Sequence, residues 1–222
     1  MKTAHNAEHN KEKNRYEYRA KNTLLEIFPS EFDGLKKSEK PDWVDASKSV
    51  GVEVVRATDR HFQKEIGHFN NKAAGQKRET LSMKEEYKGR IYTAKDLGLP
   101  GGSTIISHSY TIQDMGEILK ETVKEKIAHI NSGKKKYQEL RTLCLYVICE
   151  TVICYANPEA ILEFINFVQQ DYKNKFAELF VDDGYVLYRY CFTDGTTAVN
   201  KLDPVAQRIF VRTEKEIGEL DE

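Results

Sequence analysis

Two acidic residues stand at positions where a folded protein does not readily accept a charge. Asp42 follows a proline and precedes the apolar pair Trp43-Val44. Glu53 interrupts a run over 50–55 that otherwise consists of valine and one glycine. Removing a carboxylate from water is costly unless another group compensates for its charge. We therefore expect both acids to have a specific partner.

A divalent cation is the partner that this chemistry predicts. Mg²⁺ binds carboxylate oxygens, takes few protein ligands and keeps several of its waters. Two neighbouring strands, one opening with Asp42 and the other carrying Glu53, would point both carboxylates at one ion. A bound Mg²⁺ or Mn²⁺ stabilises charge on a phosphate and lowers the pKa of a bound water. The pair therefore favours phosphodiester hydrolysis.

Two residues on predicted helices face the right way to join this site. On the helix expected over 14–28, Glu17 lies at the edge of the apolar face, whereas Glu26 points away from it. On the helix expected over 113–130, Lys126 projects into the apolar stripe. A lysine near the metal would position the attacking water or stabilise the developing negative charge. We expect Glu17 to act as a third metal ligand and Lys126 as the catalytic lysine.

Both strand acids also have simpler interpretations. Pro-Asp is a common turn pair, so Asp42 would then be a turn residue. Glu53 would form a salt bridge with Arg56 or Arg60 at a sheet edge, where inward charges are found. These alternatives need no metal.

The two helix residues have simpler interpretations as well. Glu17 would pair with Lys13 or Lys21 on the helix surface, because residues four positions apart are neighbours there. Lys126 would extend past the apolar stripe near a helix C-terminus, where a cation is favourable.

The elements that would position these residues follow from hydrophobic periodicity and from turn signals. In chain order we expect a helix over 14–28, a short strand after Phe32, a polar turn over 36–39, a strand opening at Asp42, a strand over 50–56, a helix over 113–130, a covered strand starting at Thr142 and ending near Cys149, a helix starting at Asn157, strands over 176–181 and 185–192 joined by Asp183-Gly184, and a last strand over 208–212. The segment over 58–112 contains no readable motif beyond a plausible helix over 60–74 and a glycine-rich turn over 97–103. This order predicts an α/β fold with a mixed sheet flanked by helices.

Pro41-Asp42, followed eleven residues later by Glu53 in an apolar strand, resembles the signature of the PD-(D/E)XK nuclease superfamily. The resemblance implies a restriction-endonuclease-like αβββαβ core, with extra C-terminal strands here. It also implies that Asp42 and Glu53 bind the catalytic Mg²⁺, or Mn²⁺, and more loosely that Glu17 assists. The substrate would be nucleic acid, with DNA favoured over RNA.

The lysine of that signature is missing from its usual place. It normally stands two positions after the second acid, where this chain has Val55; Arg56 is adjacent but faces the other side of the strand. In some families of the superfamily the lysine lies on the following helix, which again indicates Lys126. If no lysine reaches the site, the protein would be a catalytically inactive relative that binds nucleic acid or a protein partner.

Composition sets the remaining expectations. The chain has 222 residues, of which 40% are hydrophobic and 31% charged, with a formal net charge of −1. The near-zero net charge excludes a strongly basic protein that binds nucleic acid by overall charge alone. We expect a disordered polar tail over 1–12 and one nuclease-like domain over 13–222. A homodimer would let two sites address two strands.

The absence of an apolar run long enough for a bilayer, and of a signal-peptide core, favours a cytoplasmic protein without a membrane partner. The four cysteines have no metal-binding spacing, and three of them lie in or next to the apolar run over 143–156. We interpret them as buried hydrophobic residues in a reducing compartment. The six histidines form no HExxH pair, so we assign no zinc site.

Overall fold

The computed structural model describes residues 2–58, 112–132, 140–149 and 158–203, with side chains from 13–58, 116–132, 140–149 and 160–203. The chain divides into two units, Met1–Ala57 with Gly116–Glu222, and Thr58–Met115. The fold below is that of the first unit. The prediction of a single domain over 13–222 stays a prediction.

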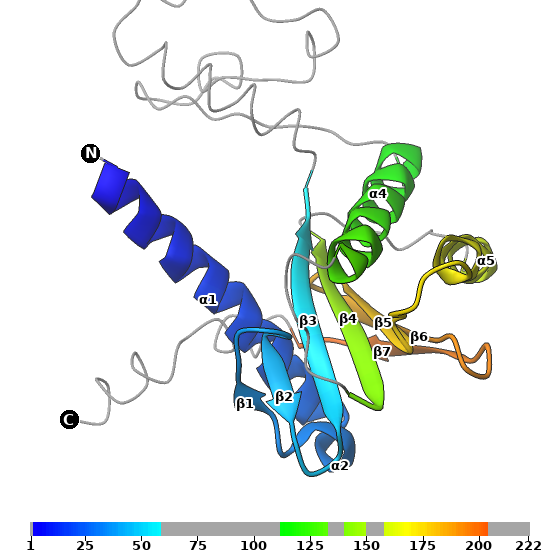
Figure 1. The fold of residues 1–222 in the computed structure, drawn as a ribbon, viewed down its shortest axis with the longest axis horizontal. Helices are drawn as coiled ribbons and strands as arrows, with labels where there is room; N and C mark the ends of the chain where they lie inside the picture. The colour runs from blue at the N-terminus through cyan, green and yellow to red at the C-terminus, as the bar shows by residue number, and fades with distance from the viewer. Residues whose placement is uncertain (1, 59–111, 133–139, 150–157, 204–222) are drawn as a thin grey trace, which may run out of the picture. The chain divides into compact units, whose positions relative to one another are not determined.

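The described residues form a mixed α/β structure built on a seven-stranded sheet (Figure 1). Its helices are α1 (Lys2–Ile27), α2 (Pro29–Phe32), α4 (Ile112–Asn131) and α5 (Pro158–Gln169). Its strands are β1 (Lys36–Lys37), β2 (Trp43–Asp45), β3 (Val50–Ala57), β4 (Thr142–Cys149), β5 (Glu178–Asp182), β6 (Val186–Cys191) and β7 (Thr197–Lys201). The predicted mixed sheet flanked by helices is confirmed.

The strands lie side by side in chain order, from β1 to β7. Strands β1, β2 and β3 form an antiparallel meander, β3, β4 and β5 run parallel, and β6 and β7 return antiparallel. A parallel pair requires a crossover connection. Helix α4 lies in the connection from β3 to β4, and α5 lies in that from β4 to β5.

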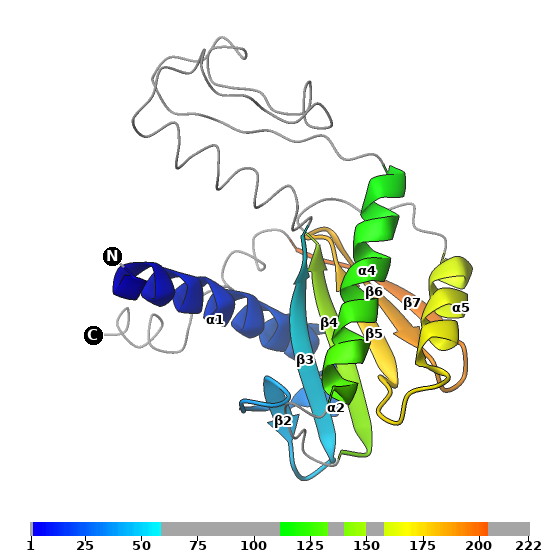
Figure 2. The ribbon, with the colours of Figure 1, turned by 45° about the horizontal axis from the view of Figure 1, so that its top comes forward.

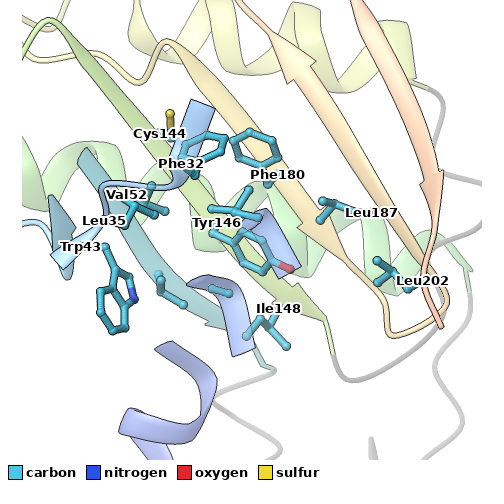
Figure 3. Close-up of a cluster of buried hydrophobic side chains, with 13 residues drawn as sticks. Phe32, Leu35, Trp43, Val52, Cys144, Tyr146, Ile148, Phe180, Leu187 and Leu202 are labelled. Atoms are coloured by element: carbon cyan, nitrogen blue, oxygen red, sulfur yellow. The ribbon is translucent and has the colours of Figure 1, made fainter. Parts of the chain in front are cut away.

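Helices cover both faces of the sheet, as the turned view makes clear (Figure 2). On one face, α1 packs through Ala20 and Leu24 against a cluster that includes Trp43 and Tyr146 (Figure 3). Residues of β4 alternate between the two faces of the sheet. Tyr146 belongs to the cluster on the α1 face, so Leu145 and Val147 are on the opposite face. The stripe predicted for α4 is buried at Leu119, Val123, Ile127 and Ile130. β4 is therefore covered on both faces, as its near-continuous apolar sequence predicts.

Two of the predicted segments differ from the structure. The polar turn expected over 36–39 is wrong at its start, because Lys36 and Lys37 form β1 and pair with Val44 and Trp43. The following strand begins at Trp43, one residue after Asp42. Two lysines have no strand propensity of their own, so this short pairing depends on β2.

The two ends of the chain also depart from expectation. Helix α1 begins at Lys2, earlier than the predicted Asn14, within the segment expected to be a tail. Strand β7 was not predicted; it pairs with β6 through a turn in which Gly195 has a φ of 73°. The strand predicted over 208–212 and the helix over 60–74 lie outside the described residues.

Cys144 and Cys149 are buried free thiols, and Cys191 is a half-buried one; Cys154 lies outside the described part. Burial raises the pKa of the Cys144 thiol well above its usual value, which suits a small hydrophobic residue. None of the helices in the described ranges combines the length and the apolar character that a bilayer crossing demands.

Candidate functional site

The antiparallel pairing of β2 with β3 brings Asp42 and Glu53 together. Trp43 pairs with Val52 and Val44 with Gly51, so Asp42, one residue before β2, is level with Glu53. Residues directly opposite on antiparallel strands have their Cβ atoms about 5 Å apart. The eleven-residue spacing is therefore that of a tight hairpin that places two acids side by side.

Both acids are buried, and a backbone group holds Asp42 in place. Asp42 Oδ2 accepts a 2.8 Å hydrogen bond from the backbone N–H of Val54. Its interpretation as a mere turn residue is therefore insufficient, because the side chain itself joins the two strands. Gly51 allows Pro41 to approach: a Cβ on Gly51 would lie 2.5 Å from Pro41 Cγ.

Helix α1 brings Glu17 to the same end of the meander. The indole Nε1 of Trp43 donates a 2.9 Å hydrogen bond to the backbone oxygen of Glu17, which ties α1 to β2 next to Asp42. The Glu17 side chain is buried and forms an ion pair with Lys37 of β1. As predicted, Glu26 is exposed.

Helix α4 brings Lys126 to Glu53 from the other face of the sheet. The Lys126 ammonium forms an ion pair with Glu53 Oε1, and the side chain of Lys126 is only 18% exposed. Arg56 instead lies over the ring of Tyr16 in α1, 4.8 Å from its centroid, on the opposite face. Since β3 lies between β2 and β4, Glu53 is not at a sheet edge.

Two lysines that the sequence did not single out for the site complete the cluster. Lys13 Nζ lies 3.1 Å from Glu17 Oε1 and 3.6 Å from Asp42 Oδ1, so it bridges two of the acids. Lys37 contacts Glu17. For Lys13 the signal was its position four residues before Glu17, whereas Lys37 was assigned to a turn and gave no signal.

The charges of Asp42, Glu53 and Lys13 all act on the ammonium group of Lys37. Burial lowers the pKa of the Lys37 ammonium from its usual value, and the positive charge of Lys13 acts in the same direction. The carboxylates of Asp42 and Glu53 oppose this shift. Lys37 is thus within electrostatic reach of Asp42, just before β2, and of Glu53 in β3, while it contacts Glu17 of α1. We call Glu17, Asp42, Glu53, Lys13, Lys37 and Lys126 the acid–lysine cluster.

The carboxylate oxygens of the acid–lysine cluster are the ligands that a hard cation prefers, but lysine ammonium groups contact them in this structure. Within the described ranges, no set of three His, Cys, Asp or Glu side chains is arranged as metal ligands. Mg²⁺ needs only one or two carboxylates besides water and substrate oxygens, and Asp42 and Glu53 can supply these. Among the described residues, none donates a hydrogen bond to the buried Glu17 Oε1, which forms an ion pair with Lys13 at 3.1 Å. The carboxylates therefore have the ligand chemistry that Mg²⁺ prefers, and lysines contact all three of them.

Two pockets lined by described residues lie away from this cluster. One, of about 430 Å³, has Lys48, Arg141, Glu31 and Glu178 in its wall. The other, of about 270 Å³, lies beside Asp194. No residue of the acid–lysine cluster lines either pocket, and their mixed charges indicate no particular ligand.

Compared with protein-family models, with curated proteins and with solved structures, the chain matches none of them.

Proposed function

We propose that this protein is a Mg²⁺- or Mn²⁺-dependent hydrolase of nucleic-acid phosphodiesters, of the PD-(D/E)XK type. The observation that carries the proposal is the placement of two buried carboxylates, Asp42 and Glu53, level with each other on adjacent strands. A lysine from another element, Lys126, contacts the second of them. Acids and a lysine in such an arrangement suit phosphodiester chemistry.

The order of the elements supports the same proposal. Helix α1 and the short α2 precede the β1–β2–β3 meander, and α4 and the parallel strand β4 come after residues 59–111, which lie outside the described part. With α2 and that segment left aside, the order agrees with the αβββαβ order that the resemblance implies, and β5, β6 and β7 would be additions. The signature has a lysine at the position of Val55, on the same side of the strand as Glu53. Lys126 on α4 can take its place, because its ammonium group contacts Glu53.

In the proposed site, Asp42 and Glu53 hold the cation and Glu17 supports it. A bound Mg²⁺ would supply charge stabilisation at the phosphate and a more acidic water. The backbone N–H of Val54 fixes one oxygen of Asp42 and leaves the other directed at the cluster. Lys126 orients the attacking water or stabilises the negative charge that develops on the phosphate.

A cleavage assay tests this function. Labelled DNA and RNA are incubated with the protein in Mg²⁺, in Mn²⁺ and in a chelator. We expect cation-dependent cleavage that falls to background in Asp42→Asn and in Glu53→Gln. The matched control is Glu163→Gln, an exposed acid on α5, which should cleave at the rate of the unmodified protein.

The role of Lys126 is tested separately with Lys126→Met. We expect cleavage to fall about 100- to 1,000-fold, the range for losing one group that stabilises charge in the transition state. Lys124→Met, an exposed lysine on the same helix, is the control. Equal rates in the two variants would remove Lys126 from the mechanism.

A second candidate is a catalytically inactive module that binds nucleic acid or a protein partner. The observation that favours it is that lysines contact all three acids in the structure, so no cation is needed for charge balance. Nucleic-acid binding without cleavage, unchanged by a chelator and by Asp42→Asn, would favour this candidate. The preference for DNA and a homodimeric state are also proposals, which the substrate comparison and sedimentation would test.

A further inference from the structure

The acid–lysine cluster contains two kinds of lysine. Lys126 is largely covered and reaches Glu53 from α4. Lys13 and Lys37 instead reach Glu17 and Asp42 from the solvent side of α1 and β1. Lys13 lies between the carboxylates of Glu17 and Asp42.

The lysines and the acids that they hold differ sharply in exposure. The side chains of Lys13 and Lys37 are 59% and 40% exposed, whereas that of Glu17 is 3% exposed. An exposed lysine loses side-chain freedom when it is held in one ion pair, and water screens the attraction. The Lys13 ammonium can therefore move into solvent, and that of Lys37 can do so by leaving the ring of Trp43, 4.8 Å from its centroid, while the carboxylates stay in place.

The charges of the cluster balance in two ways. Three carboxylates carry −3, and Lys13, Lys37 and Lys126 carry +3, so the cluster is neutral as it stands. If Lys13 and Lys37 leave and one divalent cation enters, the sum is again −3 + 1 + 2, which is zero. A monovalent cation would leave one buried negative charge uncompensated, which is unfavourable.

We propose that Lys13 and Lys37 are exchangeable counter-cations that hold the carboxylates until one divalent cation replaces them. The inference deepens the proposed function and rests on it. The two lysines determine the charge of the ion that is accepted, and they set its affinity by competing for the same oxygens. Lys126 stays in place during the exchange.

Competition has an effect that a purely structural salt bridge does not have. Removing Lys37 leaves Glu17 with less compensation, so the cation-free protein loses stability. The same change removes a competitor and a repelling charge, so a divalent cation binds more tightly. Stability without the cation and affinity for the cation should therefore move in opposite directions.

The experiment measures Mn²⁺ binding by calorimetry and thermal unfolding in a chelator for the whole chain. Lys37→Met and Lys13→Met should each bind Mn²⁺ about 3- to 10-fold more tightly than the unmodified protein. Each should unfold at a lower temperature in the chelator and regain that loss when Mn²⁺ is added. The matched control is Lys36→Met, the exposed neighbour in β1, which should change neither quantity.

Each outcome decides between the two proposals. If the unmodified protein binds Mn²⁺ and both variants bind it equally or more weakly, the exchange is overturned but the metal site stands. If none of them binds Mn²⁺, and the Lys13→Met/Lys37→Met double variant does not either, the metal site fails as well. Binding that appears only in the double variant supports the exchange. Should Lys37→Met not fold, Lys37→Gln and the more exposed Lys13→Met serve instead.

Discussion

At the scale of single residues, each buried carboxylate is held by a different set of donors. A backbone N–H fixes Asp42, and lysine side chains hold Glu17 and Glu53. Asp45, at the end of β2, accepts hydrogen bonds from the N–H and hydroxyl of Ser47 and from the N–H of Lys48. Glu17 and Glu53 are thus held by long lysine side chains, whereas Asp42 and Asp45 accept hydrogen bonds from the backbone.

The pair of Glu53 and Lys126 gives a first prediction. Lys126→Met removes a partner from a buried carboxylate and should lower the free energy of unfolding by about 1–3 kcal/mol. Urea unfolding at neutral pH measures this loss, and the exposed Lys124→Met should change it by less than about 0.5 kcal/mol. If Glu53→Gln recovers none of the loss in the double variant, the ion pair is not its cause.

Gly34 gives a second prediction, because a Cβ at this position would lie 2.2 Å from Asp45 Oδ2. The hydrogen bonds of Ser47 and Lys48 keep the carboxylate from moving, so Gly34→Ala should cost about 1–3 kcal/mol of unfolding free energy. Gly116→Ala in α4 is the control: apart from its chain neighbours and the helix's own backbone, no atom of the described residues lies within 4 Å of its added Cβ. There, alanine should stabilise the helix by about 0.5–1 kcal/mol.

The pKa of Asp45 gives a prediction with a defined sign. The Ser47 hydroxyl and the backbone N–H groups hold that pKa below the usual 3.8, although burial acts against the shift. The group therefore contributes stability above pH 3.8, and this contribution is lost as pH falls through the lowered pKa. Ser47→Ala should lower the free energy of unfolding near pH 7, and the difference should shrink below pH 3.8. A difference that does not change with pH would contradict this linkage.

At the scale of elements, α1 positions the site because two hydrogen-bonded anchors hold it on the sheet. Trp43 hydrogen bonds to it at Glu17. Two residues further on, Arg19 forms hydrogen bonds of 2.9 and 2.5 Å with the buried Asp182 at the end of β5. Tyr146 of β4 donates to the same carboxylate at 2.8 Å. The helix is thereby fixed to β2 and β5, and Tyr146 of β4 holds the carboxylate that Arg19 binds.

Tyr146→Phe tests this anchor. The change removes one donor from Asp182, which keeps Arg19 and the N–H of Gly184. We expect a loss of about 1.5–3 kcal/mol in unfolding free energy, as for one hydrogen bond to a charged group. Tyr185→Phe, at an exposed tyrosine, is the control and should be close to neutral in the same urea titration.

At the scale of the whole molecule, the sheet joins an antiparallel meander to a parallel centre, and the candidate site lies within the meander. A ligand that binds only the folded state must stabilise the whole fold. At a Mn²⁺ concentration about 100-fold above its dissociation constant, the proposed site would add about 2.7 kcal/mol. For a chain of this size that raises the unfolding temperature by roughly 5–10 °C. Calorimetric scans should show this rise in the unmodified protein and not in Asp42→Ala; an equal rise in both would place the ion elsewhere.

Hydrophobic periodicity in the sequence predicted α4, β4 and α5 closely, because each has a buried face or is covered on both faces. Strand β7 could not be predicted in this way: none of its residues is buried, so it has no alternating pattern. Strand β1 was missed for a related reason, since Lys36 and Lys37 are both exposed and pair only because β2 is beside them.

By itself, the sequence determined the mixed α/β architecture and identified Asp42 and Glu53 as acids in apolar surroundings. Both can be read from short windows of sequence, because hydrophobic periodicity and an interrupting charge are local patterns. The sequence indicated Lys126 for the site and Lys13 as a partner of Glu17, but only the tertiary structure decided that Lys126 contacts Glu53 and Lys37 contacts Glu17. Lys126 is seventy-three positions from Glu53, and Lys37 is twenty from Glu17. Such contacts depend on strand register and helix packing, which bring together residues that are far apart in the chain. Their spacing in the sequence does not predict the contact.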